Sequence, residues 1–271
     1  MLHSPNPMPH RPTDNRAGNA MVLTDRDIKI VADVADFQIL TRDQLQRLGH
    51  FRSRTRANAT LLRLTAFGYL CRRYQPAVAG TQRALYLLGP QSAALLNQGG
   101  LNVAAERKRV KTLSDLFLAH QLLVNDVRLS FRRVGTVAHL DRWTNDVDLR
   151  AAALGIIPDG HVAYIIEGKH FGAFIELDRG TETLDRWQSK VHAYIRLAAS
   201  GRYRQVFGHQ YFRVLVVAPA TARIEHLRRA TARVTDKIFW FTGIQPLAVD
   251  GPLASIWWRP TGASLHSLKE I

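Results

Sequence analysis

Three acidic residues between positions 156 and 178 have the types and the spacing to hold a metal ion. The segment IIPDGHVAYIIEGKHFGAFIELD reads as two strands, with Asp159 on the first and with Glu176 and Asp178 two residues apart on the second. Residues at i and i+2 of a strand point to the same face. Oxygen ligands of this kind suit Mg²⁺ or Mn²⁺, which take one or two carboxylates and complete their shell with water and phosphate. The alternative is a solvated strand end that holds no ligand.

The turn between these two strands predicts which residues face each other. A two-residue type II′ loop has glycine first, which places the turn at Gly168-Lys169. Asp159 then lies opposite Asp178, and His161 lies opposite Glu176. Like charges directly opposite each other destabilise a sheet, so this pairing favours a bound cation. The reverse face is apolar and carries Val162, Tyr164, Ile166, Ala173, Ile175 and Leu177.

The composition predicts a globular protein of one large or two modest domains with a polyanionic partner. The chain has 271 residues, 46% of them hydrophobic, a formal net charge of +15 and a pI near 10.7. A positive field of this size attracts nucleic acid or an acidic membrane surface. The single Cys71 excludes an intrachain disulfide and a cysteine-based zinc cluster, which fits a reducing, cytoplasmic compartment.

Two features of the chain bear on membranes and on order. No apolar run approaches the length of a membrane span, and the first residues lack the pattern of a signal peptide, so no membrane association is expected. Residues 1–21 are rich in Pro, Asn and Arg, and we expect them to form a disordered arm.

Residues 22–104 predict a winged helix-turn-helix domain. Three helical patterns begin after the capping residues Thr24, Thr41 and Ser53. Two strand patterns follow at 69–75 and 82–88, and the loop PAVAGT joins them. Three helices and a hairpin in this order are typical of a winged helix. Its third helix enters the major groove of DNA, while the wing contacts backbone or minor groove.

Arginines concentrate on the parts of this domain that would contact DNA. Between Arg42 and Arg83 there are nine arginines and one acid, Asp43. Seven of them are predicted to contact DNA from the third helix and the wing: Arg52, Arg54, Arg56, Arg63, Arg72, Arg73 and Arg83. A single helical arginine usually only faces solvent, but this concentration in this motif indicates double-stranded DNA as the partner. The alternative is a winged domain that binds another protein.

Residues 105–271 predict a second domain, which makes the fold class of the chain mixed α/β. A charged hinge, AERKRVK, leads into an apolar helix opened by Thr112 or Ser114. The expected order is then a strand near 137–140, the acidic hairpin, a helix at 181–199, a strand at 212–219, a helix at 221–234 and C-terminal strands ending in SIWWRP. This alternation is typical of a mixed sheet with helices on both faces. The aromatic residues of the C-terminal strands are expected in the core rather than at an interface.

The second domain resembles the PD-(D/E)XK nuclease superfamily, with Pro158-Asp159 on one strand and Glu176 on the next. The whole order is similar to the replication-relaxation family over about residues 22–220: a winged domain, the HQLLVNDVR helix, IIPDG, FIELDRGTE and a helix with KVHAY. That family is associated with plasmids and other mobile elements and is named for a part in plasmid replication or DNA relaxation. The resemblance implies a restriction-endonuclease-like domain and a Mg²⁺- or Mn²⁺-dependent endodeoxyribonuclease.

One position departs from the superfamily motif. The motif would place a lysine two residues after Glu176, where this chain has Asp178. Lys190, in the following helix, is the candidate to stabilise the charge that develops on phosphate, although a solvated helix lysine explains it as well. Arg179 is a second source of positive charge that cannot act as a base. In an active enzyme Asp159 and Glu176 would hold one ion, Asp178 would orient it or a second one, and water would attack the phosphodiester in line.

Two histidines and one polar pair are also expected near the site. His120 and Asn125-Asp126 match the family pattern HxxxxND and would line the same site, but core packing or helix capping explains them equally well. His161 would be an outer partner of Glu176, or a polar strand residue without a role.

Three functions stay open. The first is a DNA-binding nuclease or nickase of a mobile element, and the second is a DNA-binding regulator or replication or transfer accessory factor whose nuclease fold does not cut. The third is a protein-interaction module, which would bind DNA weakly or without salt dependence. Winged regulators often bind paired half-sites, so a homodimer and replication or transfer proteins are further expected partners.

Overall fold

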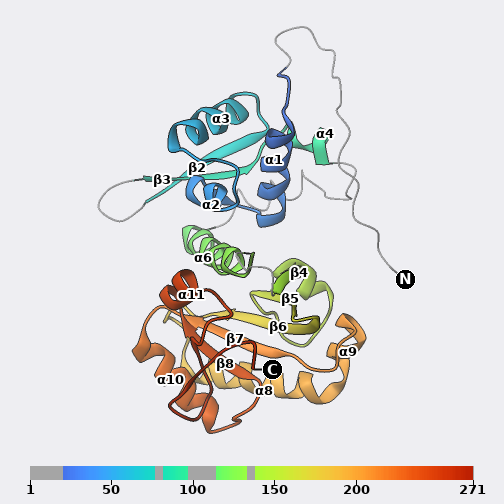
Figure 1. Ribbon diagram of the computed structural model, residues 1–271, viewed down its shortest axis with the longest axis vertical. Helices are drawn as coiled ribbons and strands as arrows, with labels where there is room; N and C mark the ends of the chain where they lie inside the picture. The colour runs from blue at the N-terminus through green and yellow to red at the C-terminus, as the bar shows by residue number, and fades with distance from the viewer. Residues whose placement is uncertain (1–20, 77–81, 97–113, 133–137, 271) are drawn as a thin grey trace. The chain divides into compact units, whose positions relative to one another are not determined.

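The computed structural model describes residues 21–76, 82–96, 114–132 and 138–270 (Figure 1). The chain divides into two compact units, Met1–Asn125 and Asp126–Ile271. The predicted boundary between residues 104 and 105 lies outside the described residues, and so does the predicted N-terminal arm apart from Met21. Helices and a seven-stranded sheet confirm the prediction of a mixed α/β fold.

The first three helices begin directly after the residues predicted to cap them. They are α1 (Asp25–Phe37), α2 (Arg42–Arg47) and α3 (Arg54–Ala66), capped by Thr24, Thr41 and Ser53. The first two caps are full capping boxes, in which the cap hydroxyl and the third helical side chain each accept a backbone N–H. Because a helix start leaves its first N–H groups without partners, such side chains determine where the helix begins.

A three-stranded sheet completes the first unit's predicted order of elements. Strands β2 (Leu70–Pro76) and β3 (Gln82–Leu88) form an antiparallel hairpin, and β1 (Leu40–Thr41) pairs with the other side of β3. Most of the predicted loop between β2 and β3 lies outside the described residues. One face of the sheet packs into a small core formed by Ile39, Leu85, Leu87, Leu118 and Leu122. Arg72 and Tyr86 are directly opposite each other and lie on the reverse face.

Two helices follow the hairpin. The short α4 (Ser92–Leu96) comes first, and α6 (Asp115–Arg132) is the predicted apolar helix. Ser114 opens α6 by accepting a hydrogen bond from the Phe117 N–H at 3.2 Å, whereas Thr112 lies outside the described residues.

The second unit is built on a mixed sheet in the order β10-β9-β8-β7-β6-β5-β4. Its strands are β4 (Ala138–Asn145), β5 (Gly160–Ile166), β6 (Lys169–Leu177), β7 (Arg213–Ala218), β8 (Phe239–Gly243), β9 (Trp257–Trp258) and β10 (Leu265–His266). The pairs β6–β7 and β7–β8 are parallel and the other pairs are antiparallel. β6 has neighbours on both sides and is buried over most of its length.

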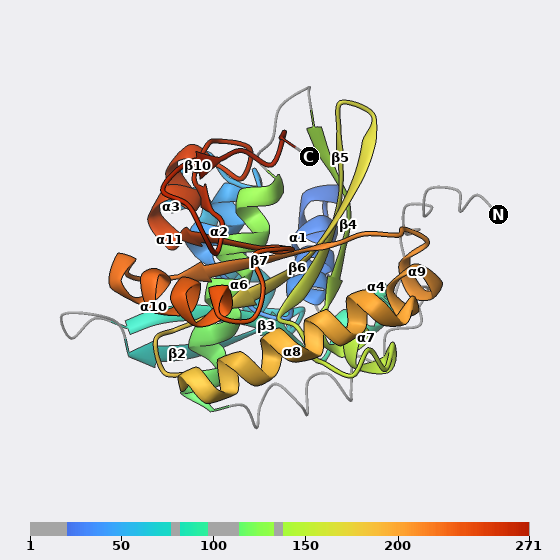
Figure 2. The same ribbon diagram turned by 90° about the horizontal axis from the view of Figure 1, so that it is seen from below.

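The helices that cover this sheet are α7 (Asp146–Ala151), α8 (Leu184–Ser200), α9 (Arg202–Phe207), α10 (Thr221–Ala232) and α11 (Ile244–Asp250). Of these, α8 and α10 lie across one face of the sheet (Figure 2). α8 and α10 were predicted, while the short α7, α9 and α11 were not. The main core includes Phe239 and Phe241, as expected for the C-terminal aromatic strands, together with Trp187 of α8 and Phe174 of β6. Within the described part of the chain, no helix has the length and apolarity that spanning a membrane requires.

The register of the β5–β6 hairpin corrects the predicted turn. Ile166 pairs with Lys169, so the loop is Glu167-Gly168 rather than Gly168-Lys169. Both loop residues have positive φ, at 49° and 78°, as a type I′ turn requires. The partners therefore shift by two residues, and His161 faces Phe174 instead of Glu176. A shift of two keeps every side chain on its predicted face.

The corrected register places His161 in an aromatic environment. Its ring stacks on Phe207 with centroids 4.0 Å apart, and Nε2 is 3.0 Å from the hydroxyl of Tyr203. Burial, followed by the charges of His209 and Arg142, lowers the pKa of His161 to about 3. His161 is therefore a neutral core residue, which is the second of the two roles considered for it.

Gly172 is the residue on β6 that makes room for this arrangement. A Cβ atom built there would overlap the hydroxyl of Tyr203 and approach His161 Nε2 to 3.4 Å. We expect Gly172→Ala to lower the free energy of unfolding by about 2 kcal/mol, because the added methyl overpacks a filled core. Urea denaturation followed by circular dichroism measures this change. Adding Tyr203→Phe should recover part of the loss, and a Gly172→Ala variant as stable as the natural chain would contradict the crowding.

Candidate functional site

Glu176 occupies the centre of a polar cluster on β6. Its side chain is 3% exposed, and both of its oxygens have a partner on α8. Lys190 Nζ lies 2.8 Å from Oε2, and the hydroxyl of Tyr194 donates to Oε1 at 2.5 Å. Lys190 also lies 3.3 Å from Oε1 of Glu182. The helix lysine predicted from the sequence therefore contacts the strand glutamate.

Asp159 joins this cluster from the start of β5. Its N–H donates to the Ile175 carbonyl at 3.1 Å, and its Oδ2 accepts from the Leu177 N–H at 2.7 Å. These two bonds, to the residues on either side of Glu176, hold Asp159 beside Glu176 rather than beside Asp178. The negative charge of Asp159 is close enough to act on both Glu176 and Lys190.

The structure does not bring Asp178 into this group. Its carboxylate is 2% exposed and binds the guanidinium of Arg223 on α10, through contacts of 2.9 Å to Oδ1 and 2.6 Å to Oδ2. Arg223 also donates to the carbonyl of Glu182 at 2.6 Å. Among the residues that the structure describes, no three His, Cys, Asp or Glu side chains are grouped to hold a metal ion. Of the three predicted carboxylates, the cluster contains Asp159 and Glu176, and Glu182 is a further acid that contacts Lys190.

Burial sets the electrostatics of the cluster. Desolvation, reinforced by the charge of Asp159, raises the pKa of Glu176 to about 7 even though Lys190 and Tyr194 act in the opposite direction. Burial disfavours the charged form of Lys190, but the charge and hydrogen bond of Glu176, with Glu182 and Asp159, outweigh it and raise the pKa of the lysine. Lys190 is therefore the fixed positive charge of the cluster, and Glu176 is the group that titrates near neutral pH.

Three contributors to this region had no role assigned to them from the sequence. Tyr194 lies four residues after Lys190, and the helical repeat places it on the same face. Glu182 belongs to the ELDRGTE segment but precedes the helix, and its position was not assigned. Arg223 comes from α10, and nothing in the sequence pairs it with Asp178.

The predicted DNA-contacting arginines of the first unit fall into two groups. Five are exposed: Arg52 just before α3, Arg54 and Arg56 in its first turn, and Arg72 and Arg83 on the hairpin. The other two are bound within the fold. Arg63 donates to both oxygens of the buried Asp27 at 2.8 and 2.7 Å, and Arg73 lies 2.8 Å from Asp115 at the start of α6.

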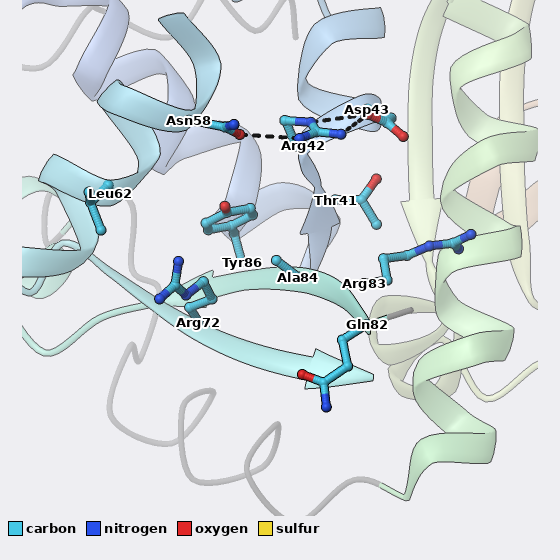
Figure 3. Close-up of a pocket in the computed structure, with 10 residues that line it drawn as sticks. All are labelled: Thr41, Arg42, Asp43, Asn58, Leu62, Arg72, Gln82, Arg83, Ala84 and Tyr86. Atoms are coloured by element: carbon cyan, nitrogen blue, oxygen red, sulfur yellow. Dashed lines mark hydrogen bonds and ion pairs between the residues drawn. The ribbon is translucent and has the colours of Figure 1, made fainter. Parts of the chain in front are cut away.

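A cleft of about 510 Å³ opens between α2, α3 and the hairpin of the first unit (Figure 3). It is lined by Thr41, Arg42, Asp43, Asn58, Leu62, Arg72, Gln82, Arg83, Ala84 and Tyr86. Three of these residues are arginines and one is an acid, so the cleft has a net positive lining.

Asn125 of the HxxxxND pattern has a packing role inside the first unit. It is buried, and its amide donates to the carbonyls of Phe37 at 3.2 Å and Ile39 at 2.6 Å. Its Oδ1 accepts a hydrogen bond from Gln121 at 3.0 Å. This is the core-packing explanation that the sequence left open for Asn125.

Comparison with known proteins identifies a family. The family model described as Replication-relaxation matches residues 31–209, well over half of the chain and parts of both units. No curated protein and no solved structure matches the chain.

Proposed function

Because the chain belongs to the replication-relaxation family, we propose that it is a DNA-binding protein of a plasmid or other mobile element. The description of the family, Replication-relaxation, is the basis for proposing a role in the replication or relaxation of that element's DNA. One observation carries the DNA-binding proposal: Arg52, Arg54 and Arg56 are exposed around the first turn of α3. This is the part of a recognition helix that reaches base edges in a winged helix-turn-helix.

Charge and element order support duplex DNA as the partner. The first unit has the order of helices and hairpin expected of a winged helix, and the chain carries a net charge of +15. Arginines of the hairpin, Arg72 and Arg83, would then contact the backbone beside the groove. Arg63 and Arg73 would contribute indirectly, since their ion pairs hold α3 to α1 and β2 to α6.

DNA binding is tested by fluorescence anisotropy with a labelled duplex of mixed sequence over a series of salt concentrations. We expect the affinity to fall steeply with salt, with a slope set by the number of phosphates neutralised. Arg54→Gln with Arg56→Gln should weaken binding about tenfold or more without lowering the melting temperature. Absent or salt-insensitive binding by the natural chain would favour a protein-interaction module instead.

A second candidate function is phosphodiester hydrolysis by the second unit, which would then act as a PD-(D/E)XK-like nuclease domain. The observation that favours it is the contact of Lys190 with Glu176 beside Asp159, which supplies an Asp, a Glu and a Lys from the expected elements. Asp159 and Glu176 are hard oxygen donors and fit Mg²⁺ or Mn²⁺ with the remaining ligands from water and phosphate. Asp178 does not fit, because it lies outside this group and is paired with Arg223 of α10.

Each residue of the cluster would have a defined task in that reaction. Asp159 and Glu176 would hold the ion, and the ion, when bound, would polarise the phosphoryl oxygens. Lys190 would stabilise the negative charge that develops on phosphate, as a preformed cation in a partly buried site. Tyr194 would orient the Glu176 carboxylate through its short hydrogen bond.

Supercoiled plasmid incubated with Mg²⁺ or Mn²⁺, and with chelator, separates cutting from binding. Nicking or linearisation that needs the metal and is lost in Asp159→Ala and Lys190→Ala would establish the nuclease. Intact DNA that is bound and shifted on a gel would instead make the protein a non-cutting regulator or accessory factor built on a nuclease-like fold.

A further inference from the structure

The cleft between α2, α3 and the hairpin contains hydrogen-bond donors that were not among the predicted DNA contacts. Arg42 lies at the start of α2 and Tyr86 lies on β3, and both line the cleft with Arg72 of β2 (Figure 3). Arg72 and Tyr86 are direct cross-strand partners. Three elements thus converge on one concave surface of the first unit.

Both arginines act on the Tyr86 hydroxyl. Burial raises the pKa of this hydroxyl, while the charges of Arg72 and Arg42 work in the opposite direction. The two guanidinium groups are therefore within electrostatic range of one neutral hydroxyl. A phenol beside two guanidinium groups offers hydrogen-bond donors to an incoming oxyanion.

Neighbouring side chains hold the two guanidinium groups in place. Arg42 donates to Asn58 of α3 at 3.2 Å and to Asp43 at 3.3 Å, which uses three of its five N–H donors. The Arg72 guanidinium lies over the ring of Tyr74, 5.0 Å from its centroid. Arginines positioned in advance lose less side-chain entropy when they bind an anion.

We propose that this cleft binds phosphate groups of one DNA strand, with Arg42 and Arg72 as the charged contacts and Tyr86 as a neutral donor. The inference rests on the proposed function, since it names a further part of the same DNA partner. Arg42 and Tyr86 become contacts that were not expected from the sequence, where only the recognition helix and the wing were assigned. Such contacts fix the position of the protein on the duplex and carry no sequence information.

The test measures DNA affinity and its salt dependence for Arg42→Gln, Arg72→Gln and Tyr86→Phe by fluorescence anisotropy. Each arginine variant should bind about tenfold more weakly and reduce the slope of log affinity against log salt by about 0.9 for each phosphate that it no longer neutralises. Tyr86→Phe should weaken binding by a few fold and leave the slope unchanged, because it removes a donor without a charge. Arg26→Gln, an exposed arginine of α1 outside the cleft, is the matched control and should change the affinity less than about twofold.

The outcomes separate this proposal from the proposed function. If the natural chain and the Arg26 control bind DNA while the cleft variants bind equally well with the same slope, the cleft proposal is overturned and DNA binding stands. A cleft variant that loses affinity for one sequence only would show a base contact, which also overturns it. If the natural chain does not bind DNA, the proposed function is wrong, and the cleft proposal is wrong with it.

Discussion

Arg223→Met is expected to lower the free energy of unfolding of the protein by about 3–5 kcal/mol, because it leaves a buried carboxylate without its cation. Asp178 is 2% exposed and Arg223 is 15% exposed, so little solvent can replace the hydrogen bonds of the guanidinium. The variant also removes the donor to the Glu182 carbonyl. Urea denaturation followed by circular dichroism at pH 7 measures the change.

A double variant provides the control. Adding Asp178→Asn to Arg223→Met removes the stranded charge while Oδ1 can still accept the Gly180 N–H. We expect the double variant to be more stable than Arg223→Met alone, since removing both charges of a buried pair costs less than removing one. A loss below about 1 kcal/mol for the single variant would mean that the pair contributes as weakly as an exposed one.

Lys190→Met is expected to destabilise the protein strongly at alkaline pH and only weakly at acidic pH. The folded pKa of Glu176 is about 7, above its ordinary value of 4.5, because burial disfavours the charged carboxylate. Its contribution to stability is therefore fully present below pH 4.5 and is lost as the pH rises to about 7. Without the lysine, the folded pKa of Glu176 rises further, so the loss continues above pH 7.

The difference in the free energy of unfolding between the natural chain and Lys190→Met should therefore widen as the pH rises. We expect it to be about 1 kcal/mol near pH 5 and about 3 kcal/mol near pH 8.5, where Glu176 is a buried carboxylate without its nearest cation. Urea denaturation at a series of pH values measures the gap. Lys190→Arg keeps the positive charge and should show no such opening, and a constant gap for Lys190→Met would contradict the coupling of the two residues.

Local signals in the sequence were enough to locate most of the fold. Thr24, Thr41 and Ser53 stand directly before the helix starts, because a capping side chain acts within three residues of its own position. The short α7, α9 and α11 have too few residues for a helical repeat to be visible. The prediction of the hairpin turn was wrong because Glu167 adopts a positive φ, a conformation that is expected mainly of glycine.

The candidate site was predictable where strand and helix geometry decided it. Asp159 and Glu176 share one face of the hairpin because the shift of the register by two residues kept the faces of β5 and β6, and Lys190 of α8 contacts Glu176 there. Asp178 follows the end of β6 and is bound by Arg223, a residue 45 positions away. Pairs of this kind, like Arg63 with Asp27, depend on packing between distant elements and leave no periodic signal in the sequence.

Helix α6 sets a limit on how this chain can be divided. Leu118 and Leu122 belong to the small core of the first unit, while the carbonyl of Phe131 accepts the hydrogen bond of Tyr164 in the second. The division between the units falls inside the helix, after Asn125. A fragment cut there would expose apolar side chains of a broken helix at its new end. Each half would need all of Asp115–Arg132, so fragments for separate study of the two units have to overlap.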